Sequence, residues 1–320
     1  VVAPWHERKD KSRSYEGQAR SSSYLTMRDG TRIALDLYLP RNLDNGDRLP
    51  AILHQTRYYR RTKLNWPYSG FEDRLDPMHV DIKRIVEHGY AYVNIDVRGS
   101  GVSFGSRQME WSPDEVQDGA EVVDWIVAQP WSNGRVGATG MSYTGTAAEM
   151  LLINQHPAVK AANLQFALFD IFADIIRPGG VRNQEFMKTW SALNDALDHG
   201  RLADFARQQM GCLAGLAVKG VAPVDGDARG ALARKAVEAH KANYDIYTES
   251  LQVHFRDDRT QEGIGLDDFS PHAFRGEIEA SGAAIQSWSG WYDGAWAMSA
   301  INRFLNVKTP GSRLILGPWD

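Results

Sequence analysis

Residues 135–156 read RVGATGMSYTGTAAEMLLINQH, which is a strand-forming run, a serine with glycines on either side, and a helical run. A sharp strand-to-helix turn strains the residue at its apex, and small neighbours are needed so that the strand and the helix can approach each other. Such a turn exposes the Ser142 hydroxyl and points the Tyr143 N–H at an oxyanion formed beside it. The stretch therefore predicts a nucleophile elbow, although its second glycine is Gly145, one residue later than in the common G-x-S-x-G pattern.

The segments around this stretch repeat an alternation of strands and helices. Two β-rich runs within residues 22–39 meet at Asp29-Gly30, which predicts an antiparallel hairpin at the start of the domain. Helical or Gly- and Pro-containing segments separate the later apolar runs, which are 51–55, 90–97, 135–141, 283–288 and 313–317. This order predicts an α/β fold with a mostly parallel sheet flanked by helices.

The same pattern divides the chain into three parts. Residues 1–21, rich in charge and serine, are expected to form an N-terminal arm. The α/β domain is expected over 22–169 and 271–320. Residues 170–270 lack the strand pattern and carry Ala, Leu, Arg, Lys and Glu at helical spacing, so they are expected to form an inserted helical cap domain.

A further helix is predicted just before the strand that leads to Ser142. Ser112 is its N-cap, Pro113 takes the first helical position, and Glu115 completes a capping box. We interpret this helix as scaffold that packs on the sheet.

Composition excludes several classes of function. The chain has 320 residues, 43% of them hydrophobic, and a net charge of −4, which removes the electrostatic reason to expect nucleic acid or an anionic membrane as a partner. No uninterrupted apolar run exceeds four residues, so no transmembrane segment is expected. The single cysteine, Cys212, excludes an intrachain disulfide and a cysteine-rich metal site, and its isolation favours the cytoplasm. The partner is expected to be a small molecule or a protein, and homo-oligomer formation is left open.

No cofactor or metal is expected. The Gly99-Ser100-Gly101 turn fails as a dinucleotide-binding motif, because Phe104 occupies the third glycine position and no helix opens there. HExxH and CxxC are both absent, so a zinc hydrolase has no support.

The stretch 129–145, QPWSNGRVGATGMSYTG, resembles the G-x-S-Y-x-G elbow of the family that contains cocaine esterase, X-prolyl dipeptidyl aminopeptidases and α-amino-acid ester hydrolases. Four more blocks resemble that family and occur in its order: MRDGTRIALDLYLP (27–40), NIDVRGSGVSFG (94–105), DIIRPGG (174–180) and SGWYDG (289–294). The resemblance implies an α/β-hydrolase fold and a serine hydrolase that works through a covalent acyl-enzyme without a cofactor.

A serine hydroxyl needs a base to take its proton and an acid to orient that base. Asp293, in the SGWYDG block, matches the acid of the family, although an Asp before Gly also often caps a turn. The family completes its oxyanion hole with a tyrosine hydroxyl, and alignment selects Tyr58, with Tyr59 as the competing choice. Tyr143 N–H would be the second donor.

Three aromatic residues near the acid are predicted to line a substrate pocket: Trp288, Trp291 and Tyr292. For Trp288, packing in the core is the competing interpretation.

The base is not evident, because all nine histidines precede Asp293. The family places its histidine after the last sheet strand in a G-P-W-x-H block, and this chain ends Gly317-Pro318-Trp319-Asp320. Our hypothesis is that the 320 residues are the N-terminal part of a longer protein whose next residue is histidine, and that the C-terminal jelly-roll domain of the family is absent from this chain.

These features predict a hydrolase that cleaves an ester or amide acyl bond, with a carboxylic or α-amino-acid ester as the expected substrate. Release of dipeptides after proline, as in the X-prolyl dipeptidyl aminopeptidases, is the first alternative. A catalytically silent hydrolase fold that serves as a binding module is the second, and the missing base is its support.

Overall fold

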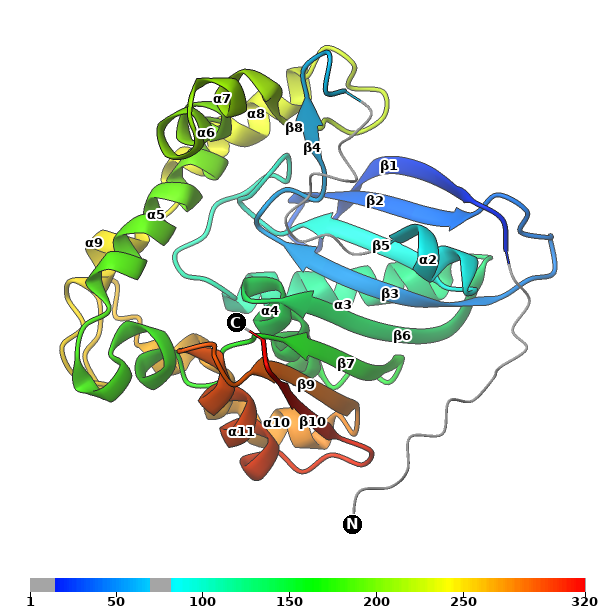
Figure 1. Ribbon diagram of the computed structural model, residues 1–320. Helices are drawn as coiled ribbons and strands as arrows, with labels where there is room; N and C mark the ends of the chain where they lie inside the picture. The colour runs from blue at the N-terminus through cyan, green and yellow to red at the C-terminus, as the bar shows by residue number, and fades with distance from the viewer. Residues whose placement is uncertain (1–14, 70–81, 320) are drawn as a thin grey trace.

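The structure is a computed structural model that describes residues 15–69 and 82–319 (Figure 1). Among these residues, eight strands form one sheet in the order β1-β2-β5-β3-β6-β7-β9-β10. The strands are β1 (Gln18–Thr26), β2 (Arg32–Pro40), β3 (Leu49–Thr56), β5 (Ala91–Asp96), β6 (Ser132–Met141), β7 (Val159–Gln165), β9 (Ala284–Gly290) and β10 (Arg313–Gly317).

The sheet is antiparallel at its beginning and parallel afterwards. β2 pairs in the antiparallel sense with β1 and β5, whereas every later pair of neighbours is parallel. Thr26 pairs with Arg32 across the Asp29-Gly30 turn, and Gly30 has the positive φ of 83° that this turn requires. The predicted hairpin and the predicted parallel sheet are confirmed.

The N-terminal segment joins the domain earlier than predicted. β1 begins at Gln18, and the buried Tyr15 donates its backbone N–H to Glu87 O at 3.0 Å. Residues 15–21 therefore pack against the domain, while the rest of the predicted arm, 1–14, lies outside the described residues.

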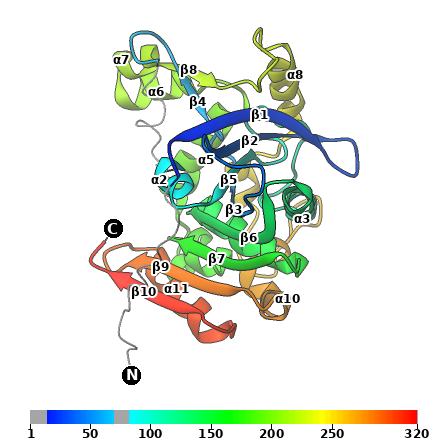
Figure 2. The same ribbon diagram turned by 90° about the vertical axis from the view of Figure 1, so that its right-hand side faces the viewer.

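Helices lie on both faces of the sheet (Figure 2), but they do not cover all of it, because residues of β6, β7 and β9 line an open hollow. They are α2 (Ile82–Glu87), α3 (Pro113–Ala128), α4 (Tyr143–Met150), α10 (Arg275–Ala280) and α11 (Trp296–Asn306). On one face, Val86 of α2 packs with Tyr92 of β5. On the other face, Val122 and Ile126 of α3 belong to the main hydrophobic core. β5 is buried at all six of its positions, as expected for a strand that is covered on both sides.

The predicted cap region contains several helices, one strand and irregular segments between them. It contains α5 (Gln184–Asp198), α6 (Leu202–Met210), α7 (Cys212–Ala217), β8 (Val218–Val221), α8 (Ala231–Ala239) and α9 (Ile246–Ser250). β8 is a strand where only helices were expected, and it pairs with β4 (Thr62–Leu64) of the sheet domain in the antiparallel sense. Figure 1 shows these helices beside the end of the sheet at which β3 and β6 finish.

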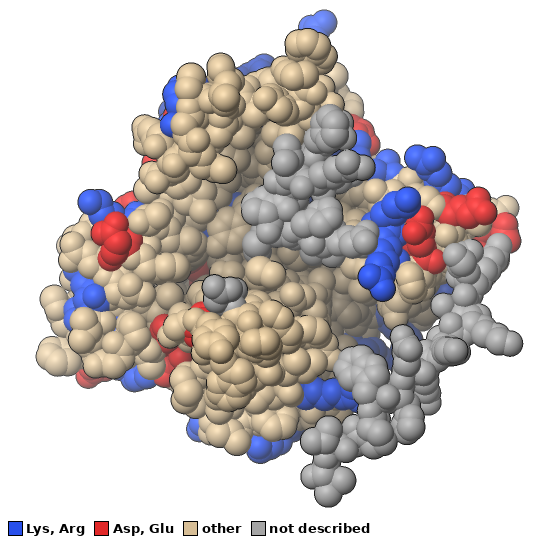
Figure 3. Space-filling view, in the orientation of Figure 1, with Lys and Arg blue, Asp and Glu red and all other residues tan. Residues whose placement is uncertain are grey.

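The described surface carries charges of both signs. On the face drawn in Figure 3, Lys and Arg lie interspersed with Asp and Glu toward the rim of the view. Within residues 15–69 and 82–319, none of the helices combines the length and the hydropathy that crossing a bilayer requires.

A buried ion pair ties the helix after Ser142 to the helix after Asp293. The pair joins Glu149 of α4 to Arg303 of α11, and their side chains are 0% and 1% exposed. Arg303 Nε lies 2.8 Å from both carboxylate oxygens of Glu149. The ion pair therefore fixes the position of α4, which follows Ser142, relative to α11, which follows Asp293.

Glu149→Gln should lower the free energy of unfolding by about 3 to 5 kcal/mol, because it leaves the Arg303 charge buried without its counter-charge. Urea denaturation would measure this. The matched control is Asp204→Asn, which breaks the exposed Arg207–Asp204 pair of α6 and should change the value by less than about 0.5 kcal/mol. Equal losses in the two variants would contradict the structural role of the buried pair.

Candidate active site

Ser142 occupies a strained turn between β6 and α4. Its backbone has φ 56° and ψ −123°, a conformation that non-glycine residues rarely adopt. Ser142 N donates to Gln165 O of β7 at 2.9 Å, which holds the apex against the neighbouring strand. The side chain is partly exposed and lines a cavity. The strand–serine–helix turn predicted from the sequence is therefore present.

Both flanking glycines are required by close contacts. A Cβ on Gly140 would lie 2.2 Å from the backbone carbon of Thr144, and a Cβ on Gly145 would lie 3.0 Å from Ala167 Cβ. The position between them is occupied by a buried threonine, and Thr144 Oγ1 donates to Met141 O at 2.8 Å and accepts from Met141 N at 2.7 Å. The second glycine comes late because position 144 closes the turn with its side chain and position 145 is the one that faces β7.

Tyr58 lies beside Ser142 in the same cavity. Its hydroxyl interacts with the Ser142 side chain, and its ring meets the Tyr143 ring edge-on with 5.9 Å between the centroids. Trp190 Nε1 donates to Tyr58 Oη at 2.9 Å. Burial raises the pKa of Tyr58 to about 12, so the phenol is a neutral hydrogen-bond donor.

Tyr59, the competing choice, is directed elsewhere. Its hydroxyl donates to Leu197 O at 2.8 Å, and the residue is absent from the cavity wall. The structure therefore favours Tyr58 over Tyr59 for a role next to Ser142.

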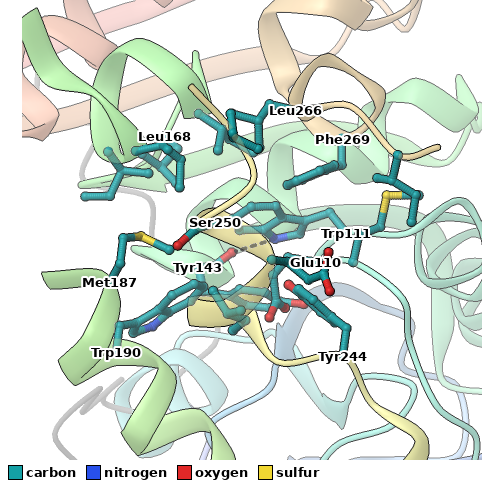
Figure 4. A pocket seen from close by; sticks show the side chains of 18 of the residues that line it. Glu110, Trp111, Tyr143, Leu168, Met187, Trp190, Tyr244, Ser250, Leu266 and Phe269 are labelled. Carbon is teal, nitrogen blue, oxygen red and sulfur yellow. Dashed lines mark hydrogen bonds between the residues drawn. The ribbon is translucent and has the colours of Figure 1, made fainter. Parts of the chain in front are cut away.

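Tyr143 is buried below the turn and is held by α3, which sequence reasoning treated only as scaffold. Its hydroxyl donates to Glu115 Oε1 at 2.6 Å, and Trp111 Nε1 donates to Tyr143 O at 3.2 Å (Figure 4). Ser112 Oγ accepts from Glu115 N at 3.2 Å, which confirms the predicted N-cap. The Glu115 carboxyl group does not complete the predicted capping box, because it is turned inward to Tyr143. Burial raises the pKa of Glu115 to about 8.

Asp293 lies in the turn after β9. Its Oδ1 accepts from the backbone N–H groups of Ala295 and Trp296 at 3.0 and 3.2 Å, which is the turn-capping role weighed in the sequence analysis. Among the described residues, no hydrogen bond is formed by Oδ2. One carboxylate oxygen therefore orders the turn, and the other remains available for a further partner.

Among the described histidines, none forms a hydrogen bond with Ser142 or Asp293, so none of them is identified as the base. Two of the nine, His6 and His79, lie outside the described residues. The other seven bond to different groups: His54 to Asn94, His88 to Arg84, His156 to Asp124, His199 to Asp195, His240 to Asp198 and Ser103, His254 to Arg177, and His272 to Ser270.

The cavity beside Ser142 has a volume of about 170 Å³ and a mostly apolar wall. Apolar side chains from the cap and from the segment after β7 form this wall, among them Leu168, Met187, Leu266 and Phe269 (Figure 4). Ile175 and Ile246 also line it. Two carboxylates, Glu110 and Glu249, also line it. The Glu110 carboxylate is paired with the buried guanidinium of Arg57.

The three aromatic residues predicted to line the pocket lie outside its wall. Trp288 is half-buried and packs against the exposed Trp319, with 5.7 Å between the ring centroids, so it lies neither in the cavity wall nor in the hydrophobic core. Trp291 and Tyr292 are 60% and 75% exposed, because the turn after β9 directs them to solvent. The indoles that do line the cavity are Trp111, Trp190 and Trp296.

Residues 15–69 and 82–319 contain no group of three or more His, Cys, Asp or Glu side chains that could hold a metal ion.

Comparison with known proteins gives a consistent result. The family model of the X-Pro dipeptidyl-peptidase (S15 family) matches residues 29–320. A protein of Mycobacterium bovis with the provisional name serine esterase is 48% identical over 345 aligned residues, which cover 99% of this chain and 54% of the relative. Cocaine esterase of Rhodococcus sp. is 27% identical, over 94% of this chain and 48% of the esterase. This chain spans about half the length of these relatives.

Solved structures agree on the fold. A CocE/NonD family hydrolase of Staphylococcus aureus superposes with a TM-score of 0.67 at 19% identity, over 93% of this chain and 45% of that protein. An α-amino acid ester hydrolase superposes with a TM-score of 0.55 at 20% identity, over 99% of this chain and 50% of that protein. These likenesses confirm the predicted α/β-hydrolase fold.

Gly140→Ala should destabilise the protein by at least about 2 kcal/mol, because the added methyl group meets backbone that cannot move aside. Thermal denaturation and fluorophosphonate labelling of the full-length protein would measure stability and the reactivity of Ser142, and both should fall. Gly137→Ala is the control in the same strand, since its Cβ would find its nearest neighbour at 3.8 Å. If the two variants behave alike, the close approach at Gly140 does not shape the turn.

The burial of Glu115 predicts a pH dependence of stability. Its pKa is raised from 4.5 to about 8, so between these values the folded state holds a proton that the unfolded state has released. The free energy of unfolding should therefore decrease as the pH rises from about 5 to 8, by up to about 1.4 kcal/mol per pH unit from this group.

Glu115→Gln should remove that part of the slope, since Gln retains an acceptor for Tyr143 but does not ionise. Urea denaturation of the wild type and the variant at several pH values between 5 and 8 would test this, with the exposed Glu238→Gln as control. A difference between wild type and Glu115→Gln that is constant over this pH range would refute the assignment.

Proposed function

The chain belongs to the X-Pro dipeptidyl-peptidase (S15) family, and from this premise we propose that the full-length protein is a serine hydrolase that cleaves an ester or amide bond through an acyl-enzyme on Ser142. One observation carries the proposal: the strained Ser142, the Tyr58 hydroxyl and the first residue of α4 line a single cavity. This is the arrangement that nucleophilic attack on a carbonyl requires.

The chemical step follows from these positions. Ser142 Oγ attacks the carbonyl carbon of the substrate, and its proton passes to a histidine base. The carbonyl oxygen becomes an oxyanion, which accepts hydrogen bonds from Tyr143 N–H and Tyr58 OH. The intermediate then expels the alcohol or amine, which takes the proton from the histidine, and a water molecule hydrolyses the acyl-enzyme by the same route.

Asp293 is proposed as the acid that orients the base. The base itself is proposed to be a histidine that follows Asp320 in the full-length protein. The path of the last described residues supports this, because Trp291 N donates to Gly317 O at 2.9 Å and Tyr292 N donates to Trp319 O at 3.1 Å. The chain therefore reaches Trp319 beside the turn that carries Asp293.

The substrate is proposed to be a carboxylic ester with an apolar acyl or alcohol group. The mostly apolar cavity wall supports this choice, since such a wall binds apolar groups through burial. The Glu249 carboxylate at the wall would also suit an α-amino-acid ester, and an X-prolyl dipeptide remains the alternative substrate. These are small-molecule or short-peptide substrates.

A catalytically silent binding module is the alternative from another class. Only the unidentified base supports it. The strained conformation at Ser142 argues against it, because a module that does not use the serine hydroxyl has no need to maintain a costly backbone geometry at that residue.

Ser142→Ala should lower the hydrolysis of p-nitrophenyl butyrate by the full-length protein by roughly 10⁴-fold or more, and it should abolish fluorophosphonate labelling without changing the circular dichroism spectrum. Ser289→Ala is the matched control. Its hydroxyl is buried and has no hydrogen-bond partner in the part of the chain that the structure describes, so its removal should leave labelling intact. Turnover retained by Ser142→Ala would refute the nucleophile, and a wild-type protein that is never labelled would favour the silent module.

A substrate panel would separate the two enzymatic alternatives. p-Nitrophenyl acetate, p-nitrophenyl butyrate, an α-amino-acid p-nitrophenyl ester and Ala-Pro-p-nitroanilide would be compared by kcat/KM. The proposal expects the highest value for an apolar ester. A preference for Ala-Pro-p-nitroanilide would replace the esterase assignment with the peptidase assignment.

A further inference from the structure

The cap helix α5 contacts the loop of Tyr58 at three successive residues. Residues 57–59 bond to Asp198, Trp190 and Leu197 in that order, at 3.2, 2.9 and 2.8 Å. Leu197 and Asp198 follow Trp190 by seven and eight positions, which is two helical turns, so the three partners lie on one face of α5. One face of α5 thus holds residues 57–59, the first part of the loop between β3 and β4.

The indole of Trp190 is itself oriented by its neighbours. Its ring stacks on Phe186 of the same helix, with 6.2 Å between the centroids and 19° between the planes. The Arg57 guanidinium lies 5.6 Å from the ring centroid. Figure 4 shows Trp190 and Met187 extending from one helix into the pocket. The Trp190 ring therefore has contacts with its own helix and with the loop of Tyr58. These contacts hold the indole N–H toward Tyr58.

We propose that Trp190 is a positioning residue for the oxyanion hole: by donating its indole N–H to Tyr58 Oη, it directs the phenolic hydrogen of Tyr58 toward the substrate oxygen at Ser142. This inference rests on the proposed function, in which Tyr58 is an oxyanion donor.

The direction of the bond is unambiguous, because an indole nitrogen donates and does not accept. The phenolic oxygen therefore uses one acceptor site for Trp190, and its single hydrogen remains for another acceptor. A hydrogen bond received by the phenolic oxygen also polarises its O–H group, which makes it a stronger donor to a developing negative charge. The cap thus contributes to the geometry of the reacting centre as well as to the wall of the substrate cavity.

Trp190→Phe tests the inference, because it removes the N–H and keeps an aromatic ring for stacking. The full-length wild type, Trp190→Phe, Tyr58→Phe and the double variant would be compared with p-nitrophenyl butyrate. Trp190→Phe should lower kcat by roughly 3- to 10-fold, with KM changed by less than about two-fold. Tyr58→Phe should lower kcat by roughly 10²-fold.

The decisive measurement is the effect of Trp190→Phe when Tyr58 is already phenylalanine. In that protein, Trp190→Phe should change kcat by less than about two-fold, because the indole then has no phenol to orient. The rate of phosphonylation by a fluorophosphonate gives a second readout that does not depend on the choice of ester, and melting curves establish that each variant is folded.

Trp296→Phe is the matched control, since Trp296 also lines the cavity and forms no described hydrogen bond with Tyr58. Its effect should be the same with and without the Tyr58 hydroxyl. The inference is overturned if the Trp190→Phe substitution lowers kcat in the Tyr58→Phe protein as much as in the wild type, or if it changes KM alone. Trp190 would then only form part of the pocket wall. Failure of the proposed function is distinguishable, because Ser142→Ala would then retain turnover.

Discussion

The close approach of β6 and α4 at Ser142 is the constraint on which the rest of the site depends. A side chain at position 140 would overlap the Thr144 backbone at 2.2 Å, and one at position 145 would press on Ala167 at 3.0 Å. At the apex between them, Ser142 has a φ of 56°. Hydrogen bonds between Thr144 and Met141 and between Ser142 and Gln165 stabilise this strained turn. The turn presents a hydroxyl at the cavity and brings the start of α4 beside it, which places the proposed nucleophile next to the proposed oxyanion donor.

Support for this turn comes from elements that lie far from it in the sequence. Glu115 of α3 holds the Tyr143 side chain from below, whereas Trp190 of α5 holds Tyr58 from the cap. The Glu149–Arg303 pair joins α4 to the helix that follows the turn of Asp293. Scaffold and cap therefore hold neighbouring groups of the same site, and a change in either is expected to reach the proposed chemistry through a named hydrogen bond or ion pair.

The sequence was informative where function imposes a local steric requirement. The glycines around Ser142, the Asp29-Gly30 hairpin and the Ser112 cap are short-range features, and the structure contains all of them. β7 was not predicted, because VKAANLQ has few of the β-branched and aromatic residues that mark a strand. Trp190 was also missed: it is 132 positions from Tyr58, and a contact at that separation leaves no periodic pattern. Trp291 and Tyr292 show the opposite error, since neighbours of the acid in sequence need not face the pocket.

The most direct test of the account is peptide mapping by mass spectrometry of the full-length protein after reaction with a fluorophosphonate. One stoichiometric adduct is expected, located on Ser142 within the peptide that spans the end of β6 and the start of α4. An adduct on a different residue, or an unmodified Ser142 in a protein that still hydrolyses esters, would contradict the claim that the strained turn carries the nucleophile.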